Sequence, residues 1–124
     1  MLKPVEGLHD GMTVEGNLDL TGRRDIVRLP DDLTVNGYLS CSGCINLQEV
    51  PKNLHVKDYL SLRKCRSLKA MAPVNVEGKI YIDPELIRRT PYDILPLLLG
   101  MHFSTVPMDM SVDVIIEKRL RGEP

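Results

Sequence analysis

The chain repeats one phrase with a period of about 21 residues, and this period limits what it can fold into. Residues 33–50 read LTVNGYLSCSGCINLQEV. Related phrases occupy residues 12–29 and 54–71, and a shortened copy occupies residues 74–83. The copies follow one another at steps of 21, 21 and 20 residues, as marked by Val14, Val35, Val56 and Val76. Such a period is typical of a solenoid, because one copy cannot bury its apolar face alone and stacked copies can.

Each copy opens with alternating side chains, which predicts a strand with one buried face. In the second copy the inward set is Val35, Gly37, Leu39 and Cys41, and the outward set is Asn36, Tyr38, Ser40 and Ser42. A glycine recurs within the pattern, so we expect the strand to bend or restart there. The strands of successive copies should join in a parallel sheet. Further along each copy an apolar pair should turn inward, namely Ile26 with Leu29, Leu47 with Val50, and Leu68 with Met71.

The phrase L-x-L-x-x-C followed by L-x-x-L/V-P resembles a leucine-rich repeat, in particular the short bacterial type. Residues 39–44 and 47–51 carry the closest likeness, which extends over roughly residues 12–83. The resemblance implies an α/β fold, a small curved solenoid whose parallel sheet lines a concave face that usually binds proteins. Arg23 and Asp58 depart from the repeat pattern. We expect about three and a half copies, with residues 1–11 as an N-terminal cap or degenerate repeat.

Residues 84–124 leave the repeat and predict a mostly helical C-terminal cap. Asp83 as a capping residue before Pro84 starts a helix that should end before Pro91. Residues 92–101 predict one or two short buried helices. Residues 111–121 predict a helix with one apolar face, made of Val112, Ile115, Ile116 and Leu120. An alternative is a strand, because Met108, Met110, Val112 and Val114 also alternate.

Three cysteines invite a metal or redox interpretation, which the repeat register disfavours. Cys41 and Cys44 form a C-x-x-C, with Cys65 downstream and His55 as a conceivable fourth zinc ligand. However, Cys41 takes the place of a buried leucine, and Cys44 and Cys65 share one ladder position where small polar groups bond the turn backbone. We therefore expect buried structural thiols. Neither a nucleophile elbow nor a phosphate-binding loop is present in the sequence, so we expect no enzyme, no cofactor and no metal.

Composition limits the surroundings and the partners of the chain. Its 124 residues suggest one domain, and a net charge of -1 gives no general attraction to nucleic acid or anionic lipid. The few cysteines favour a reducing compartment, and the sequence lacks a secretory signal or an apolar run long enough to cross a membrane. We expect a cytoplasmic protein, with delivery to another cell as an open alternative.

The outward strand positions carry the functional expectation. Three of the four tyrosines fall on this one face, and tyrosine is enriched at interfaces. We therefore expect a non-enzymatic module that binds a protein partner through the exposed face of the sheet. The bland alternative is that aromatic residues there only favour the strand. The expected partner-binding residues are Tyr38, Tyr59, Tyr81, Arg63, Asn17 and Lys79.

Three other functions stay open at this point. The chain could be a small inhibitor or effector from a mobile element or a pathogen. Residues 54–73 hold five basic residues against one acidic residue, which allows nucleic-acid binding through the third repeat, although the net charge speaks against it. Residues 94–110 are rich in Met and Leu and could pair two chains as a homodimer.

Overall fold

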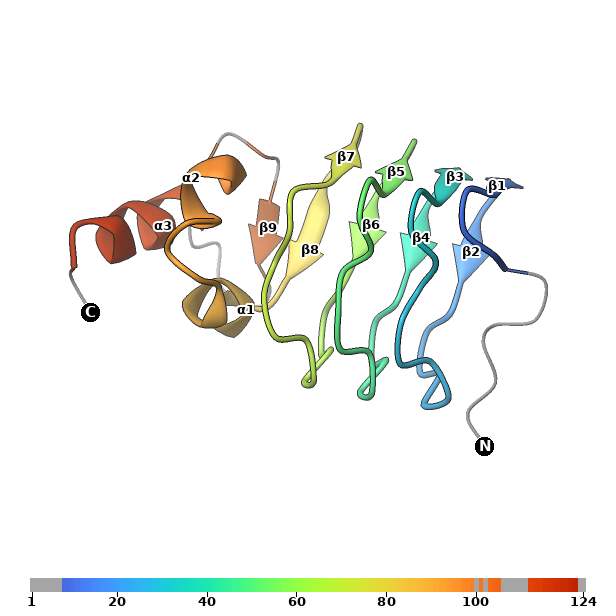
Figure 1. Cartoon of the computed structure of the whole chain (residues 1–124), viewed down its shortest axis with the longest axis horizontal. Coiled ribbons are helices and arrows are strands. Elements are labelled where there is room, and N and C mark those ends of the chain that lie inside the picture. The colour runs from blue at the N-terminus through green and yellow to red at the C-terminus, as the bar shows by residue number, and fades with distance from the viewer. Residues whose placement is uncertain (1–7, 100, 102, 106–111, 123–124) are drawn as a thin grey trace.

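The computed structural model describes residues 8–99, 101, 103–105 and 112–122. Most of the expected N-terminal cap, residues 1–7, therefore lies outside the described residues. The repeats form a parallel β-solenoid in which each coil carries a pair of short strands (Figure 1). The first sheet has the order β1 (Thr13–Glu15), β3 (Thr34–Asn36), β5 (His55–Val56) and β7 (Asn75–Val76). The second has the order β2 (Leu18–Asp19), β4 (Leu39–Ser40), β6 (Leu60–Ser61), β8 (Ile80–Ile82) and β9 (Phe103–Thr105).

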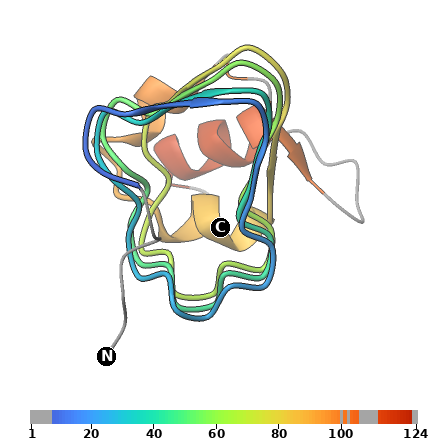
Figure 2. The same cartoon turned by 90° about the vertical axis from the view of Figure 1, so that its right-hand side faces the viewer.

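Strand pairing follows the alignment of the repeats. Val35 pairs with Val14 on one side and with Val56 on the other, and Leu39 pairs with Leu18 and Leu60 in the same way. Seen along the stack, the coils lie almost on top of one another (Figure 2). The parallel arrangement is thus confirmed, and a one-residue slip would turn every apolar side chain outward.

The strand of each copy restarts at the position of the recurring glycine, as expected, including the third copy, where Asp58 takes its place. The consequence is two parallel sheets instead of one. Gly37 lies at this corner, directly against the preceding coil. A Cβ atom on Gly37 would lie 2.6 Å from the carbonyl oxygen of Gly16 and 2.5 Å from Oδ1 of Asn17. The glycine therefore permits two backbones to approach closely while the chain turns from β3 to β4.

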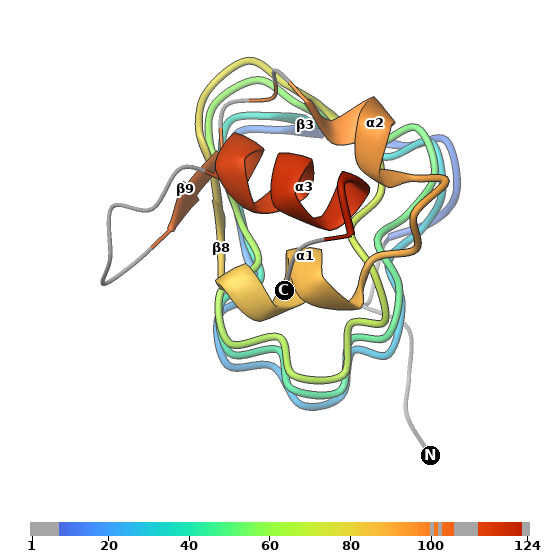
Figure 3. The same cartoon turned by 90° about the vertical axis from the view of Figure 1, so that its left-hand side faces the viewer.

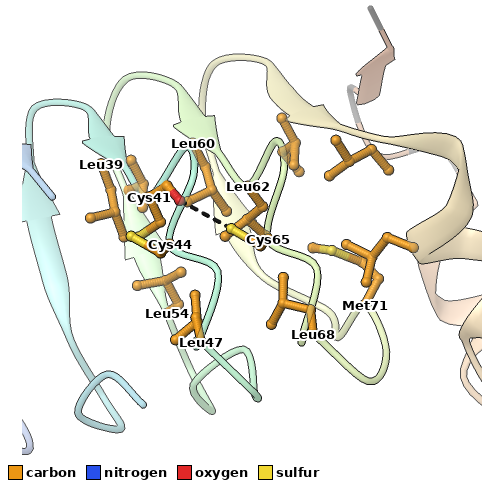
Figure 4. Close-up of a cluster of buried hydrophobic side chains, with 14 of the residues drawn as sticks. Leu39, Cys41, Cys44, Leu47, Leu54, Leu60, Leu62, Cys65, Leu68 and Met71 are labelled. Atoms are coloured by element: carbon orange, nitrogen blue, oxygen red, sulfur yellow. Dashed lines mark hydrogen bonds between the residues drawn. The ribbon is translucent and has the colours of Figure 1, made fainter. Parts of the chain in front are cut away.

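The core is aliphatic and runs through the whole stack (Figure 4). In the second coil, the inward-facing side chains are fully buried: Leu33, Val35, Leu39, Cys41, Cys44 and Leu47. The predicted inward pairs are buried too, except that Val50 is only half-buried. Each coil thus supplies one thin apolar layer that its neighbours cover.

Within its described residues the C-terminal cap has three helices, which cover the last coil (Figure 3). They are α1 (Pro84–Arg89), α2 (Leu95–Leu98) and α3 (Val112–Leu120), and α3 packs against α1, α2 and β9. Their buried residues join the core of the solenoid: Leu86, Ile87, Leu95, Leu98, Val112, Ile115 and Ile116. None of the described helices is long and apolar enough to cross a membrane.

The cap corrects four expectations. Leu120 is 40% exposed, because α3 buries only the earlier part of its apolar face. The carboxylate of Asp83 makes no capping bond to α1. Val112 and Val114 are helical, so the alternative strand is wrong there, while Met108 and Met110 lie outside the described residues. Strand β9 was not expected, and it extends the second sheet beyond β8.

Candidate binding face of the second sheet

Three tyrosines form a continuous cluster over the second sheet, here called the tyrosine face: Tyr38, Tyr59 and Tyr81. Tyr38 and Tyr59 immediately precede β4 and β6, so the stacking of the coils places them side by side. Their rings are stacked, with centroids 4.7 Å apart and planes 8° from parallel. Tyr81, within β8, meets Tyr59 edge-on at 5.8 Å and 82°. The expected proximity of the three residues is confirmed.

The side chains of the tyrosine face are half-buried, and Tyr59 lies between Tyr38, which stacks on it, and Tyr81, which meets it edge-on. Partial desolvation raises the pKa of the Tyr59 phenol, and the neighbouring Tyr38 adds to the effect. The Tyr59 phenol therefore stays neutral at physiological pH, and the tyrosine face offers aromatic area and hydroxyl groups to a partner.

A row of hydroxyl groups runs diagonally beside the tyrosine face. Thr21 Oγ1 and Ser40 Oγ share a hydrogen bond of 2.7 Å, and Ser42 Oγ and Ser61 Oγ share one of 2.5 Å. Ser40 and Ser61 were expected to face solvent, yet they are only 7% and 6% exposed. Both serines are buried because each hydroxyl group bonds to a residue of the preceding coil, Thr21 or Ser42, and this neighbour shields it from solvent.

The row ends at Arg63, where the pattern of hydroxyl pairs breaks. In the two hydroxyl pairs, a residue of one coil bonds to a serine of the next coil that lies two positions before its own register partner. For Arg63 this diagonal position holds Tyr81, because Tyr81 pairs in register with Ser61. The Nε atom of Arg63 is buried and has no hydrogen-bond partner among the described residues. A buried donor without an acceptor costs free energy, and such an exception in a folded protein calls for an explanation.

A shallow, open pocket of about 300 Å³ lies beside Arg63. Its lining comes from the turns that follow β2, β4 and β6: Thr21, Gly22, Ser42, Gly43, Arg63 and Lys64. Gly22, Gly43 and Lys64 all have left-handed backbone, and Lys64 adopts it at φ 59° although it has a side chain. A long side chain in this conformation is strained, which marks the turn as unusual.

Asp83 supports the turn at Lys64. In the earlier coils, the amide groups of Gly22 and Gly43 donate to the carbonyl groups of Ser42 and Arg63, respectively. The amide of Lys64 instead donates to Oδ2 of Asp83 at 2.7 Å. The carboxylate of Asp83 therefore replaces the backbone carbonyl that accepts the equivalent amide hydrogen in the earlier coils. Because it is engaged in this bond, it does not cap α1.

The remaining two expected site residues, Asn17 and Lys79, hold the position of Tyr38 and Tyr59 in the first and fourth copies of the repeat. Asn17 is exposed, and its Oδ1 accepts the amide hydrogen of Tyr38 at 3.0 Å, so it positions the backbone of the tyrosine face. Lys79 is exposed and immediately precedes β8. The structure therefore brings the expected residues onto one side of the stack, with Asn17 in a structural role as well.

The three cysteines lie in the core, and the thiols of Cys44 and Cys65 bond to backbone, as expected. Cys44 Sγ donates to the carbonyl of Leu20 at 3.1 Å. Cys65 Sγ donates to the carbonyl of Cys41 at 3.0 Å, the bond drawn in Figure 4. Burial raises the pKa of the Cys65 thiol to about 12. Within the described residues no group of three metal-ligating side chains forms, and His55 faces Glu77 at 3.6 Å.

The basic residues of the third repeat do not gather on one side. Lys57 lies between β5 and β6, Arg63 and Lys64 follow β6, and Lys69 lies on the return segment, where its amide donates to the carbonyl of Gln48. Nucleic-acid binding through the third repeat stays a prediction.

The cap exposes some of its apolar side chains. Of the stretch expected to pair two chains, Leu97 and Leu99 are exposed, while residues 100, 102 and 106–110 lie outside the described residues. Self-association through this segment therefore stays a prediction.

Comparisons with protein-family models, with curated proteins and with solved structures gave no match for the chain. The site is accordingly defined by its own geometry. Sequence reasoning selected the tyrosines and Arg63 from their ladder positions, but it missed Asp83 as a partner of Lys64. It also missed that the Arg63 Nε has no partner. The presence of a partner depends on the residue at the diagonal position of the next coil, and the pattern of a single strand does not contain that residue.

Proposed function

We propose that the chain is a small, non-enzymatic interaction module of the leucine-rich-repeat type that binds a protein partner through the tyrosine face. The proposal is carried by one observation: the three half-buried tyrosines in mutual contact on one side of a rigid stack. Tyrosine supplies a large contact area with few rotatable bonds, and ordering it on binding costs little entropy.

The surroundings of the tyrosine face suit a protein better than a small molecule. The neighbouring pocket is shallow, whereas sites for small molecules are concave enough to enclose most of the ligand. Polar residues take the position of these tyrosines in the flanking coils, with Asn17 one coil before Tyr38 and Lys79 one coil after Tyr59, and Arg63 follows β6. An aromatic centre with a polar rim is the usual composition of a protein–protein interface.

The rigidity of the stack also favours this function. Backbone hydrogen bonds between coils hold each tyrosine, for example from the amide of Leu39 to the carbonyl of Tyr59 at 2.9 Å. A surface that is already ordered before binding loses little conformational freedom in the complex.

The test is partner capture from cell lysate with the wild-type chain and the double variant Tyr38→Ala, Tyr59→Ala. Glu49→Ala, Lys69→Ala serves as a matched control, because both residues are exposed and lie on the return side of the coils. We expect the tyrosine variant to bind a captured partner roughly 10- to 100-fold more weakly, as for interface hot spots. Circular dichroism and urea unfolding check that both variants fold. A partner held equally by all three proteins would refute the proposal.

A further inference from the structure

We infer that the pocket beside Arg63 is an anion-binding site that takes a carboxylate side chain, Asp or Glu, of the protein partner. The inference deepens the proposed function and rests on it, because it names the chemistry of one contact in that interface. Arg63 lies at the edge of the tyrosine face, with Tyr81 at the diagonal position of the next coil. A partner that covers the rings would therefore reach the guanidinium.

The first argument is the unpartnered donor. The Nε of Arg63 is buried against the protein and lacks an acceptor among the described residues. The Nε–H and one Nη–H of a guanidinium lie along a single edge, and a carboxylate can accept both hydrogen bonds at once. The Nε is covered in the free chain, so a carboxylate in the pocket would reach this edge once the Arg63 side chain rotates, and it would then satisfy a group that the chain itself leaves without a partner.

The second argument is local charge. Arg63 and Lys64 both line the pocket, and the other four lining residues are uncharged. Two carboxylates lie near this region, and each is already engaged. Asp83 accepts the amide hydrogen of Lys64, and Asp19 accepts two hydrogen bonds from Thr21. Both carboxylates keep their negative charge, but among the described residues neither forms an ion pair with Arg63 or Lys64, so these two cations keep their side-chain donors for a ligand.

The third argument is the shape of the turns. Gly22 and Gly43 carry no side chain, so the two turns below Arg63 leave the pocket open. The hydroxyl groups of Thr21 and Ser42 stand at its border, where each already shares a hydrogen bond with a serine. The strained left-handed backbone of Lys64 places a cation, in place of a third glycine, at the pocket wall.

The occupant is a carboxylate, because one guanidinium edge matches its planar pair of oxygens. Phosphate is the other oxyanion that guanidinium groups bind, and natural phosphate sites gather several cations or amide groups around it. The pocket holds two cations. The experiment therefore includes both chemistries.

The test is an NMR titration of the whole chain, following the Nε–H resonance of Arg63, which is assigned by its loss in Arg63→Gln. The probes are a capped pentaglutamate peptide, capped pentaglutamine as its neutral control, and inorganic phosphate, all at matched ionic strength. We expect a saturable shift with pentaglutamate alone. Binding to the variants is followed by the backbone amide resonances of Gly43 and Lys64, which line the pocket and are kept in Arg63→Gln. Arg63→Gln should weaken pentaglutamate binding roughly tenfold, the loss of one charge-assisted bidentate contact. Arg66→Gln, an exposed arginine of the same repeat, should leave it within about twofold.

The outcomes separate this inference from the proposed function. A shift with pentaglutamine as large as with pentaglutamate, or no shift with any probe, would overturn the anion site. A shift with phosphate but not with pentaglutamate would overturn the carboxylate assignment. Since the titration needs no natural partner, it can succeed when partner capture by the tyrosine face fails, and it can fail when capture succeeds.

Discussion

The hydroxyl group of Thr90 accepts the amide hydrogen of Met71 at 2.9 Å and donates to the carbonyl of Leu86 at 2.8 Å. Thr90 follows α1 and is fully buried. Met71 lies in the return segment of the third repeat, next to the cap. A side chain of the cap therefore supplies an acceptor that a further coil would otherwise provide, just as Asp83 does for Lys64.

Replacing Thr90 by Val should destabilise the chain, because it leaves the buried amide of Met71 without an acceptor. We expect the free energy of unfolding to fall by about 1–3 kcal/mol, measured by urea denaturation. Thr90→Ser keeps the hydroxyl group and should lose only about 1 kcal/mol for the missing methyl group. Equal stability of the valine variant and the wild type would show that the bond has no net effect.

Arg119 fastens α3 to the end of α1. Its Nη1 donates to the carbonyl oxygen of Ile87 at 2.6 Å and to that of Thr90 at 2.5 Å. Its guanidinium also lies 4.8 Å from the ring centroid of Tyr92. These contacts satisfy carbonyl groups at a helix C-terminus and place a positive charge there, which favours the helix dipole.

Arg119→Met should therefore lower the free energy of unfolding by about 1.5–3 kcal/mol, the range for hydrogen bonds from a charged group. Lys118→Met is the matched control, because Lys118 is the preceding residue of α3 and is exposed. The control should change stability by less than about 0.5 kcal/mol. A similar small loss in both variants would contradict a clamping role for Arg119.

The sequence predicts a structural feature well when that feature recurs in every copy of the repeat. Positions such as Val35 and Leu39 could be placed from the period alone, because every copy must bury the same face. The roles of Cys44 and Cys65 followed from the same register, and the bonds of both thiols confirm them. The arrangement of the tyrosines could be predicted for this reason too.

Features that occur once could not be predicted in this way. Thr90 and Arg119 act between segments that no repeat relates, so only the packed cap brings them to their acceptors. Strand β9 spans Phe103–Thr105, too few residues for an alternation to be recognised. The burial of Ser40 depends on a diagonal partner, which the pattern of a single strand does not contain.

Gly37 should be intolerant of a side chain, in contrast to the equivalent Asp58. A Cβ atom at Gly37 would meet backbone atoms of Gly16 that cannot move without shifting the coil. We expect Gly37→Ala to cost about 1–3 kcal/mol in urea unfolding, as overpacking does. Asp58→Ala, at an exposed position, should stay within about 0.5 kcal/mol. If the two variants lose equally little, the close approach at this corner is not required.

The stability of the chain should fall in alkaline solution through Cys65. Burial raises the pKa of this thiol from 9.0 to about 12, so the folded chain keeps a proton that the unfolded chain loses. Between these values the folded state binds more protons, and the free energy of unfolding decreases with rising pH by up to about 1.4 kcal/mol per pH unit. The contribution is fully present below pH 9.

Cys65→Ser separates this effect from other titrations, because serine keeps a hydrogen-bond donor and does not ionise in this range. Urea unfolding under reducing conditions, below and above the ordinary pKa of a thiol, should show a steeper loss for the wild type than for the serine variant. Parallel losses would mean that the thiol does not stay protonated in the folded chain.

The stacked pair Tyr38 and Tyr59 should couple only modestly in stability, although it is central to the proposed binding. A double-mutant cycle with alanine at each position should give a coupling of about 0.5–1.5 kcal/mol, the range for aromatic pairs beyond their buried area. The rings are half-buried and the apolar core beneath them is complete without them, so each single variant should remain folded. A much larger coupling would make the pair a structural element, and loss of a partner in the double variant would then reflect a damaged sheet. A coupling in the expected range leaves the rings free to act as a surface, and a lost partner can then be assigned to the contact itself.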